Sequence, residues 1–319
     1  METTLLRLLK KHLLIALLCI LAGFTGYAQP QAPTAQNKPA PAAETPGDSI
    51  DLIIRADDMG MCHAVNVAEQ KLMESGLPFS TSVMVTCPWY QEAASILKKH
   101  PETSAGVHLT LNSEWKGYRW GPVLGQEGVP TLVNENGFFF HSASGFFGNE
   151  PDMDEIEREL RAQIERALKT GMKLDYIDYH MGTAAGTPEL KKLLLKLGRE
   201  YGLGVSGFFN EARVSTYRVP YKEKKQALID KLKELKPGKT YVFVCHLGLD
   251  NPELSALKDM NEGSPLSDMS KHRNAQLETL LSRDFLNAVK KYKINPMTYR
   301  EFIAQQGMEA MEIPEDLGY

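Results

Sequence analysis

Carboxylate and imidazole side chains stand at the ends of four short runs of β-branched and other apolar residues. They are Asp57 and Asp58 after the first run, His108 in the third, Asp178 and His180 closing the fourth, and His246 closing the sixth. A protein-bound divalent metal ion takes two or three such ligands and keeps at least one position open for chemistry. Asp58, His108 and His180 can supply this set for one divalent ion, either Mg²⁺ or Zn²⁺. They are distant in the sequence, so the prediction depends on the fold that brings them together.

Three further charged residues are candidates for supporting this site. Asp178 lies two residues before His180, and alternation along a strand places both side chains on the same face. Asp178 therefore either orients a metal ligand or forms a structural salt bridge. Arg55 and Arg273 are candidate partners of Asp57 or His246, with solvated surface positions as the alternative.

An aromatic cluster follows the third run. Trp115, Tyr118 and Trp120 lie within six residues of one another. Sugars stack their apolar faces on aromatic rings, so the cluster suits a saccharide subsite. The alternative is a hydrophobic anchor for a long loop.

A scaffold of alternating strands and helices must position these residues. Apolar runs of strand length predict strands at residues 50–54, 82–86, 105–111, 174–179, 203–208, 239–245 and 295–298. Helical patterns between them predict helices at residues 62–75, 91–100, 154–170, 187–201, 222–235 and 274–292. The stretch 112–151 is rich in glycine and aromatic residues and far exceeds an ordinary loop, which predicts a flap insertion over the active site.

Strict alternation of strand and helix predicts parallel strands joined by right-handed crossovers. Two closures are available, a doubly wound sheet and a (β/α) barrel. The turn at residues 55–60 is acidic where a Rossmann fold needs a glycine-rich phosphate turn. We therefore predict an α/β fold, an incomplete or distorted seven-stranded TIM-like (β/α) barrel. Its catalytic groups are expected at the carboxyl ends of the strands.

The N-terminal residues predict export. Basic residues, a short apolar run and small residues up to Ala28 predict a signal peptide at residues 1–28. Residues 29–47 are rich in Pro and Ala and predict a disordered linker before a folded domain at residues 48–319. The apolar run is shorter than the roughly 20 residues of a membrane span, so we expect an exported, periplasmic or extracellular protein without stable membrane insertion.

Composition excludes several other classes of protein. The net charge of −4 does not favour a nucleic-acid partner. The cysteines form no CxxC pair, which excludes a zinc finger and a disulfide framework. Homo-oligomerisation stays open.

Four ordered segments resemble the motifs of the YdjC-like carbohydrate deacetylases, the family of chito-oligosaccharide and hopanoid deacetylases that is related to the polysaccharide deacetylases. The segments are LIIRADDMG at 52–60, GVHLTL at 106–111, IDYH at 177–180 and CHLG at 245–248. The resemblance extends from about residue 50 to residue 303. The chain departs from the family pattern at Met181-Gly182, where further histidines are common, and at Leu247, where proline is common.

The resemblance implies a role for each of five residues. Asp58, His108 and His180 would hold the metal ion, Asp57 would be the general base, and His246 would protonate the leaving amine. The implied activity is metal-dependent hydrolysis of N-acetyl groups on amino-sugar-containing oligosaccharides or glycans, with an N-acetylated saccharide as substrate.

Two other functions remain open from the sequence. A glycoside hydrolase could use two carboxylates such as Asp57 and Asp178, which would leave His108 and His180 without a task. A non-catalytic sugar-binding barrel would be expected to have lost the base or a metal ligand, and here all of these residues are present.

Overall fold

The computed structural model describes residues 49–261 and 268–317. The predicted signal peptide at 1–28 and the linker at 29–47 lie outside these residues. Within the described ranges, no helix is both long and apolar enough to cross a membrane.

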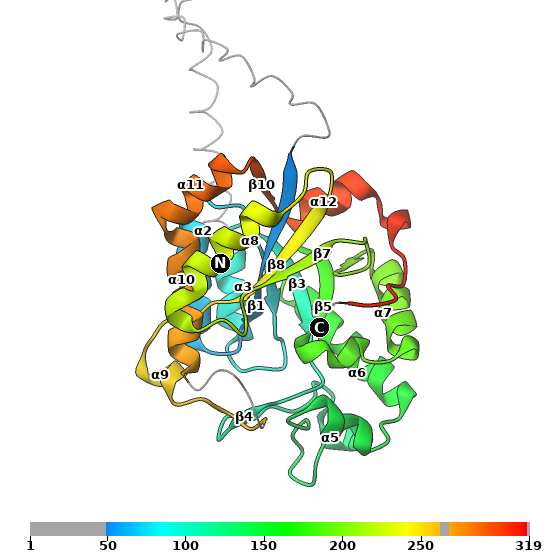
Figure 1. Cartoon of the computed structure of the whole chain (residues 1–319). Coiled ribbons are helices and arrows are strands. Elements are labelled where there is room, and N and C mark those ends of the chain that lie inside the picture. The colour runs from blue at the N-terminus through cyan, green and yellow to red at the C-terminus, as the bar shows by residue number, and fades with distance from the viewer. Residues whose placement is uncertain (1–48, 262–267, 318–319) are drawn as a thin grey trace, which may run out of the picture. The chain divides into compact units, whose positions relative to one another are not determined.

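Parallel strands form the centre of the domain (Figure 1). They are β1 (Ile50–Met59), β2 (Ser80–Val83), β3 (Ser104–Leu109), β5 (Leu174–Tyr179), β6 (Gly204–Val205), β7 (Ala212–Ser215), β8 (Thr240–His246) and β10 (Ile294–Met297). In the described part of the chain they form one eight-stranded sheet in the order β6-β5-β3-β2-β1-β8-β7, with β10 paired to the first half of β1. No pairing joins the two end strands, β6 and β7, within that part. The predicted incomplete (β/α) barrel is confirmed.

Strand β7 was not predicted. Its sequence, Ala-Arg-Val-Ser, contains one buried apolar residue, Val214. It is the end strand of the sheet and pairs only with β8 among the described strands. Most of its side chains are not buried, so they need not be apolar. A short edge strand of this kind carries little hydrophobic pattern.

Helices surround the sheet (Figure 1). They are α2 (His63–Glu74), α3 (Tyr90–Leu97), α6 (Met153–Lys169), α7 (Pro188–Tyr201), α8 (Lys224–Glu234), α9 (Pro252–Ser255), α10 (Met269–Leu281), α11 (Arg283–Lys291) and α12 (Tyr299–Gln306). The predicted start of α7 is confirmed, because the Thr187 hydroxyl accepts from Leu190 N and Pro188 occupies the first turn.

One helical prediction was wrong, and one helix was missed. The single helix expected at 274–292 is two helices, because the Ser282 side chain caps α11 by accepting from Phe285 N at 3.1 Å. The first of them, α10, begins at Met269, before the predicted start, so Arg273 lies on a helix. Helix α12 was not predicted, although Thr298 and Glu301 form a capping box at its start.

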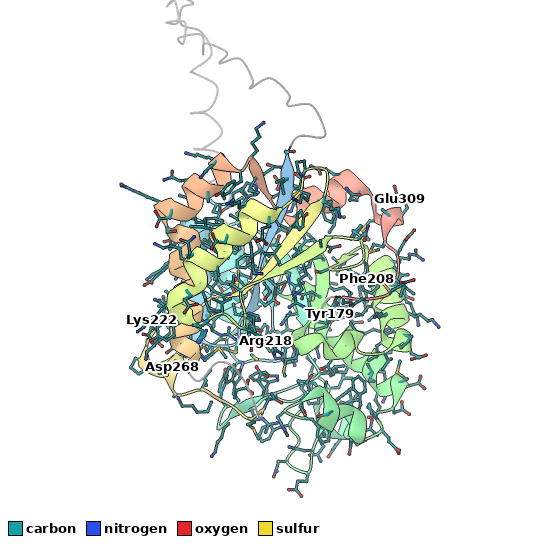
Figure 2. The ribbon with its side chains drawn as sticks, viewed as in Figure 1. Tyr179, Phe208, Arg218, Lys222, Asp268 and Glu309 are labelled. Atoms are coloured by element: carbon teal, nitrogen blue, oxygen red, sulfur yellow. The ribbon has the colours of Figure 1, made fainter. Side chains whose placement is uncertain are left out.

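The core lies between the sheet and its helices. Leu52, Ile53 and Ile54 in β1 are consecutive and fully buried, as expected for a parallel strand covered on both faces. Figure 2 shows Tyr179 and Phe208 in the interior and Lys222, Asp268 and Glu309 at the periphery.

The segment 112–151 contains short elements: β4 (Trp115–Lys116), α4 (Gly125–Gly128) and α5 (Ala143–Gly148). Strand β4 pairs with β9 (Lys258–Asp259) in an antiparallel manner. In Figure 1, β4 and α5 lie beyond the carboxyl end of β1. The segment therefore sits at the end of the barrel where the candidate residues gather.

Candidate metal centre

An irregularity at the end of β1 brings two adjacent carboxylates to one space. Asp58 has a φ of 77°, and the register between β1 and β2 shifts between Ala56 and Met59. A regular strand would direct Asp57 and Asp58 to opposite faces, whereas a bulge redirects a side chain. Aspartate is one of the residues that tolerate the left-handed region. The strand thus continues past its predicted end, and the bulge lets both carboxylates approach His108.

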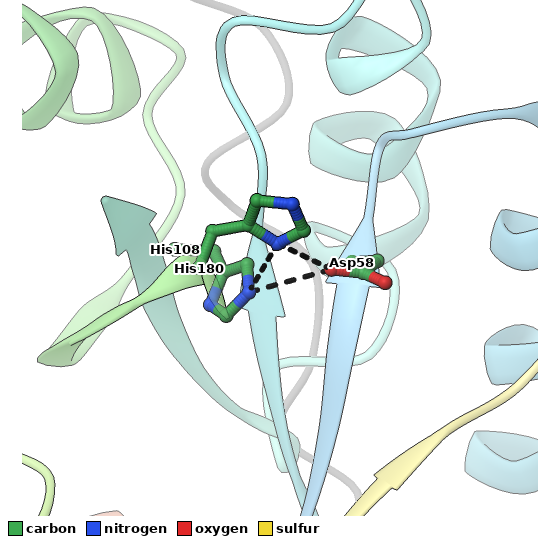
Figure 3. A group of neighbouring side chains, drawn as sticks. All are labelled: Asp58, His108 and His180. Carbon is green, nitrogen blue, oxygen red and sulfur yellow. Dashed lines mark hydrogen bonds and ion pairs between the residues drawn. The ribbon is translucent and has the colours of Figure 1, made fainter. Parts of the chain in front are cut away.

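Three ligand atoms converge at this point (Figure 3). Asp58 Oδ1 lies 3.3 Å from His108 Nε2 and 3.3 Å from His180 Nδ1, and the two nitrogens lie 3.3 Å from each other. All three side chains are buried, and Asp58 Oδ1 has no hydrogen-bond partner. The fold therefore brings together the three residues that the sequence singled out as metal ligands.

The spacing fits a bound cation. Metal–ligand bonds of about 2.0–2.2 Å at a tetrahedral angle separate two ligand atoms by roughly 3.3–3.6 Å. One carboxylate oxygen and two imidazole nitrogens form a donor set that Zn²⁺ and other divalent ions accept. The buried Oδ1 without a partner would gain one from such an ion.

Each imidazole is oriented by a second carboxylate. His108 Nδ1 lies 2.8 Å from Asp178 Oδ1, and His180 Nε2 lies 2.9 Å from Glu114 Oε2. The nitrogen that donates to the carboxylate carries the proton, so the other nitrogen presents its lone pair to the centre. Asp178 thus makes both contacts that the sequence left open, a hydrogen bond that orients His108 and an ion pair with Arg55. Glu114 was missed, because it stands in the segment after β3 where no strand pattern marks it.

The electrostatics of the centre favour charged groups despite burial. Burial opposes ionisation of Asp58, but Arg273 and the two neighbouring imidazoles hold its pKa well below the usual value. Burial also opposes protonation of the imidazoles. The Asp178 and Asp57 carboxylates nevertheless raise the pKa of His108 well above its usual value, and Glu114 and Asp58 raise that of His180 to about 9. Protons therefore compete with a cation for the same nitrogens.

Arg55 links the two remaining carboxylates. It contacts both oxygens of Asp57, at 2.7 and 2.8 Å, and its Nε lies 3.0 Å from Asp178 Oδ2. Its third nitrogen donates to Ser206 Oγ at 2.6 Å. Asp57, His108 and Asp178 form a second group with ligand spacing, but here the guanidinium supplies the positive charge.

Arg273 approaches the centre from α10. Its Nη2 donates to Asp58 Oδ2 at 2.6 Å, and its guanidinium carbon lies 6.0 Å from the centre of the Trp115 ring. Both arginines are buried, so the alternative of solvated surface roles does not describe them. Arg273 contacts the metal-ligand candidate Asp58, whereas the sequence suggested Asp57 or His246 as its partner.

His246 stands beside Asp57. The two residues are register partners on the parallel strands β8 and β1, which places their side chains on the same face. Its Nδ1 has no hydrogen-bond partner. Burial lowers the pKa of His246 to about 4, so its imidazole is neutral at neutral pH.

Trp115 and Trp120 are packed rather than open. Their exposed fractions are 2% and 3%. Trp120 Nε1 donates to Asn112 O at 2.7 Å, and its ring lies 6.1 Å from that of His180. This burial favours the hydrophobic anchor over the saccharide subsite.

Comparisons with known proteins identify relatives of the chain. A model of the YdjC-like protein family matches residues 51–291. A carbohydrate deacetylase of Thermus thermophilus is 34% identical over 232 residues, covering 65% of this chain and 81% of that protein. A carbohydrate deacetylase of Brevibacillus brevis is 34% identical over 154 residues, covering 48% of this chain and 58% of that protein. The chain thus spans less than two thirds of the length of the second relative.

A solved structure shares the fold. It comes from Enterococcus faecalis V583 and is described as a candidate cellobiose-phosphate cleavage protein. The TM-score is 0.62 at 24% identity, with 80% of this chain and 99% of that chain covered. At this identity the likeness supports the barrel alone.

Proposed function

The chain belongs to the YdjC-like protein family, and from this premise we propose that it is a metal-dependent hydrolase that removes N-acetyl groups from amino-sugar-containing oligosaccharides or glycans. The observation that carries the proposal is the buried triangle of Asp58 Oδ1, His108 Nε2 and His180 Nδ1, with edges of 3.3 Å. The names of the Thermus and Brevibacillus relatives supply the class of substrate.

One divalent ion, Mg²⁺ or Zn²⁺, would be held by Asp58, His108 and His180. When bound, such an ion polarises an acyl oxygen and lowers the pKa of water toward about 7. Asp178 and Glu114 fix the two imidazole rings, and Arg273 holds the second oxygen of Asp58.

Asp57 and His246 are proposed to move the proton. Asp57 accepts it from the attacking water, and Arg55 keeps this carboxylate in place through two hydrogen bonds. Because the low pKa of His246 keeps its imidazole neutral, the proton that it delivers to the leaving amine must be one gained during the same turnover. Asp57 passes the proton that it takes from water to the neighbouring His246, which delivers it to the amine nitrogen as the C–N bond breaks. The products, acetic acid and an amine, leave as acetate and an ammonium ion.

The glycoside hydrolase alternative is less consistent with the geometry. The Asp57 and Asp178 carboxylates both contact Nε of Arg55, at 2.7 and 3.0 Å. A glycosidic bond must fit between two catalytic carboxyl groups that are about 5 Å or more apart, and one guanidinium occupies that space here. A sugar-binding barrel without catalysis remains the alternative that an activity assay excludes.

We further propose that the protein is exported. The support is the order of basic, apolar and small residues in the first 28 positions.

A direct assay tests the proposed activity. Purified protein is incubated with a panel of N-acetylated oligosaccharides, and released acetate is measured with and without a chelator. We expect acetate release that the chelator abolishes and that Zn²⁺ or Mg²⁺ restores. Cleavage of glycosidic bonds without acetate release would favour the glycoside hydrolase, and sugar binding without either product would favour the binding barrel.

A further inference from the structure

We infer that Glu114 is a positioning residue that ties the covering segment 112–151 to the metal centre through His180. The inference rests on the proposed metal site and assigns a task to a residue outside the four motifs. It makes metal binding and the docking of β4 against β9 mutually dependent.

Glu114 is held from two directions. Its carboxylate contacts His180 Nε2 at 2.9 Å, and its backbone carbonyl accepts from Met260 N at 2.9 Å. The next residue, Trp115, is the register partner of Asp259 in the β4–β9 pair. One residue therefore joins an imidazole at the end of β5 to the small sheet beyond the barrel.

The contact decides which nitrogen of His180 faces the centre. With Nε2 donating to Glu114, Nδ1 presents its lone pair toward Asp58 Oδ1 at 3.3 Å. Without Glu114, either nitrogen could carry the proton, and part of the population would direct an N–H bond at the ion. A metal-ligating histidine depends on such a partner for its tautomer and its orientation.

Holding Glu114 in this contact orders the segment, and a bound ion would stabilise the contact in return. Glu114 is 5% exposed, so its charge needs His180 as a partner. If Glu114 helps the ion to bind, then the bound ion must stabilise the Glu114 contact by the same factor, because coupling between two binding events is reciprocal. The β4–β9 pairing should consequently be better protected when the centre is loaded.

The experiment measures Zn²⁺ affinity and amide hydrogen exchange on the full chain. Zn²⁺ is titrated in competition with a chromogenic chelator into the wild type, Glu114→Ala, Glu114→Gln and the control Glu102→Ala. Glu102 accepts from His100 at 3.1 Å on the surface, so its variant removes a similar pair away from the centre. Circular dichroism and the melting temperature without metal report whether each variant folds.

We expect Glu114→Ala to weaken Zn²⁺ binding by about 10–100-fold. Glu114→Gln should fall between Ala and the wild type, because it keeps the side-chain volume and a polar contact without the charge. The control should stay within about twofold of the wild type, since surface pairs contribute little. In the wild type, Zn²⁺ should slow exchange in residues 114–116 and 258–260, and in Glu114→Ala this added protection should be lost.

Folded Glu114→Ala with wild-type Zn²⁺ affinity would overturn the inference and leave the proposed function standing. Unchanged exchange in the wild type on adding Zn²⁺ would overturn the coupling to β4–β9. Failure of the wild type itself to bind any divalent ion would overturn the proposed function and the inference together.

Discussion

The neighbouring carboxylates Asp57 and Asp58 face different partners, and this predicts different consequences of the same substitution. Asp57 has both oxygens on Arg55, whereas Asp58 has one oxygen on Arg273 and the other directed at the two imidazoles. Asp57→Asn should lower kcat by about 10²–10⁴-fold, the contribution of a general base, with unchanged metal content. Asp58→Asn should lose metal as well as rate, because an amide is a poorer ligand.

Elemental analysis and acetate release on both variants check this contrast. Asparagine tolerates the left-handed region as well as aspartate does, so the φ of 77° at position 58 should not unfold Asp58→Asn. Equal loss of metal and activity in the two variants would show that the base and ligand roles are assigned wrongly.

Metal affinity should rise with pH over the physiological range. The carboxylates around His180 raise its pKa to about 9 in the ion-free protein, and a ligand nitrogen must lose its proton before it binds. Below that pH the ion displaces a proton, so each imidazole proton released makes the affinity about tenfold weaker per pH unit of acidification. Zn²⁺ titrations at pH 6, 7 and 8 measure how the affinity changes with pH. An affinity independent of pH would contradict the claim that the ligand imidazoles are protonated in the ion-free protein.

At the scale of elements, the packing of β3 on β5 depends on a motif glycine. A Cβ atom at Gly106 would lie 2.5 Å from the Tyr176 ring, whose hydroxyl bonds Ser82 at 2.9 Å. Ser82 in turn donates to Asp178 at 2.8 Å. Position 106 thus has room only for glycine, and the ring it accommodates supports the carboxylate that orients His108.

Gly106→Ala should destabilise the domain by about 1–3 kcal/mol, the usual cost of overpacking a core. For a domain of this size we expect the melting temperature to fall by roughly 2–4 °C per kcal/mol. Gly148→Ala is the matched control, because a Cβ there meets nothing within 4 Å and the backbone φ is ordinary. A melting temperature of Gly106→Ala equal to that of the control would contradict the packing argument.

Elements with a strong apolar pattern could be predicted from the sequence, whereas those that depend on pairing between distant strands could not. The apolar runs at β1, β5 and β8 are evident in the sequence because both faces of these strands are buried. The short strands β4, β7 and β9 depend on pairing with distant residues, whereas the break at Ser282 is a local cap inside a continuous helical pattern. The bulge at Asp58 likewise arises from pairing with β2, which no local pattern encodes.

The same distinction applies to the candidate site. Asp58, His108 and His180 could be found because strand ends meet at one face of a barrel. Glu114 could not, because its place depends on the path of the segment after β3. The one available signal is that Glu114 lies within a few residues of the strand that carries His108. Many other carboxylates share that kind of position.

At the scale of the whole molecule, export is a prediction from the first 28 residues alone. Cleavage after Ala28 should leave a mature chain beginning at Gln29. Mass spectrometry of the protein from its native host measures this directly. Retention of Met1 on a cytosolic protein would contradict it.

The central claim is that one ion joins three strand ends of an open barrel. An anomalous difference map from a crystal grown with Zn²⁺ tests it most directly. We expect one strong peak about 2.0–2.2 Å from each of Asp58 Oδ1, His108 Nε2 and His180 Nδ1. A peak between Asp57 and Asp178 in place of the Arg55 guanidinium, or no peak in the barrel, would contradict it.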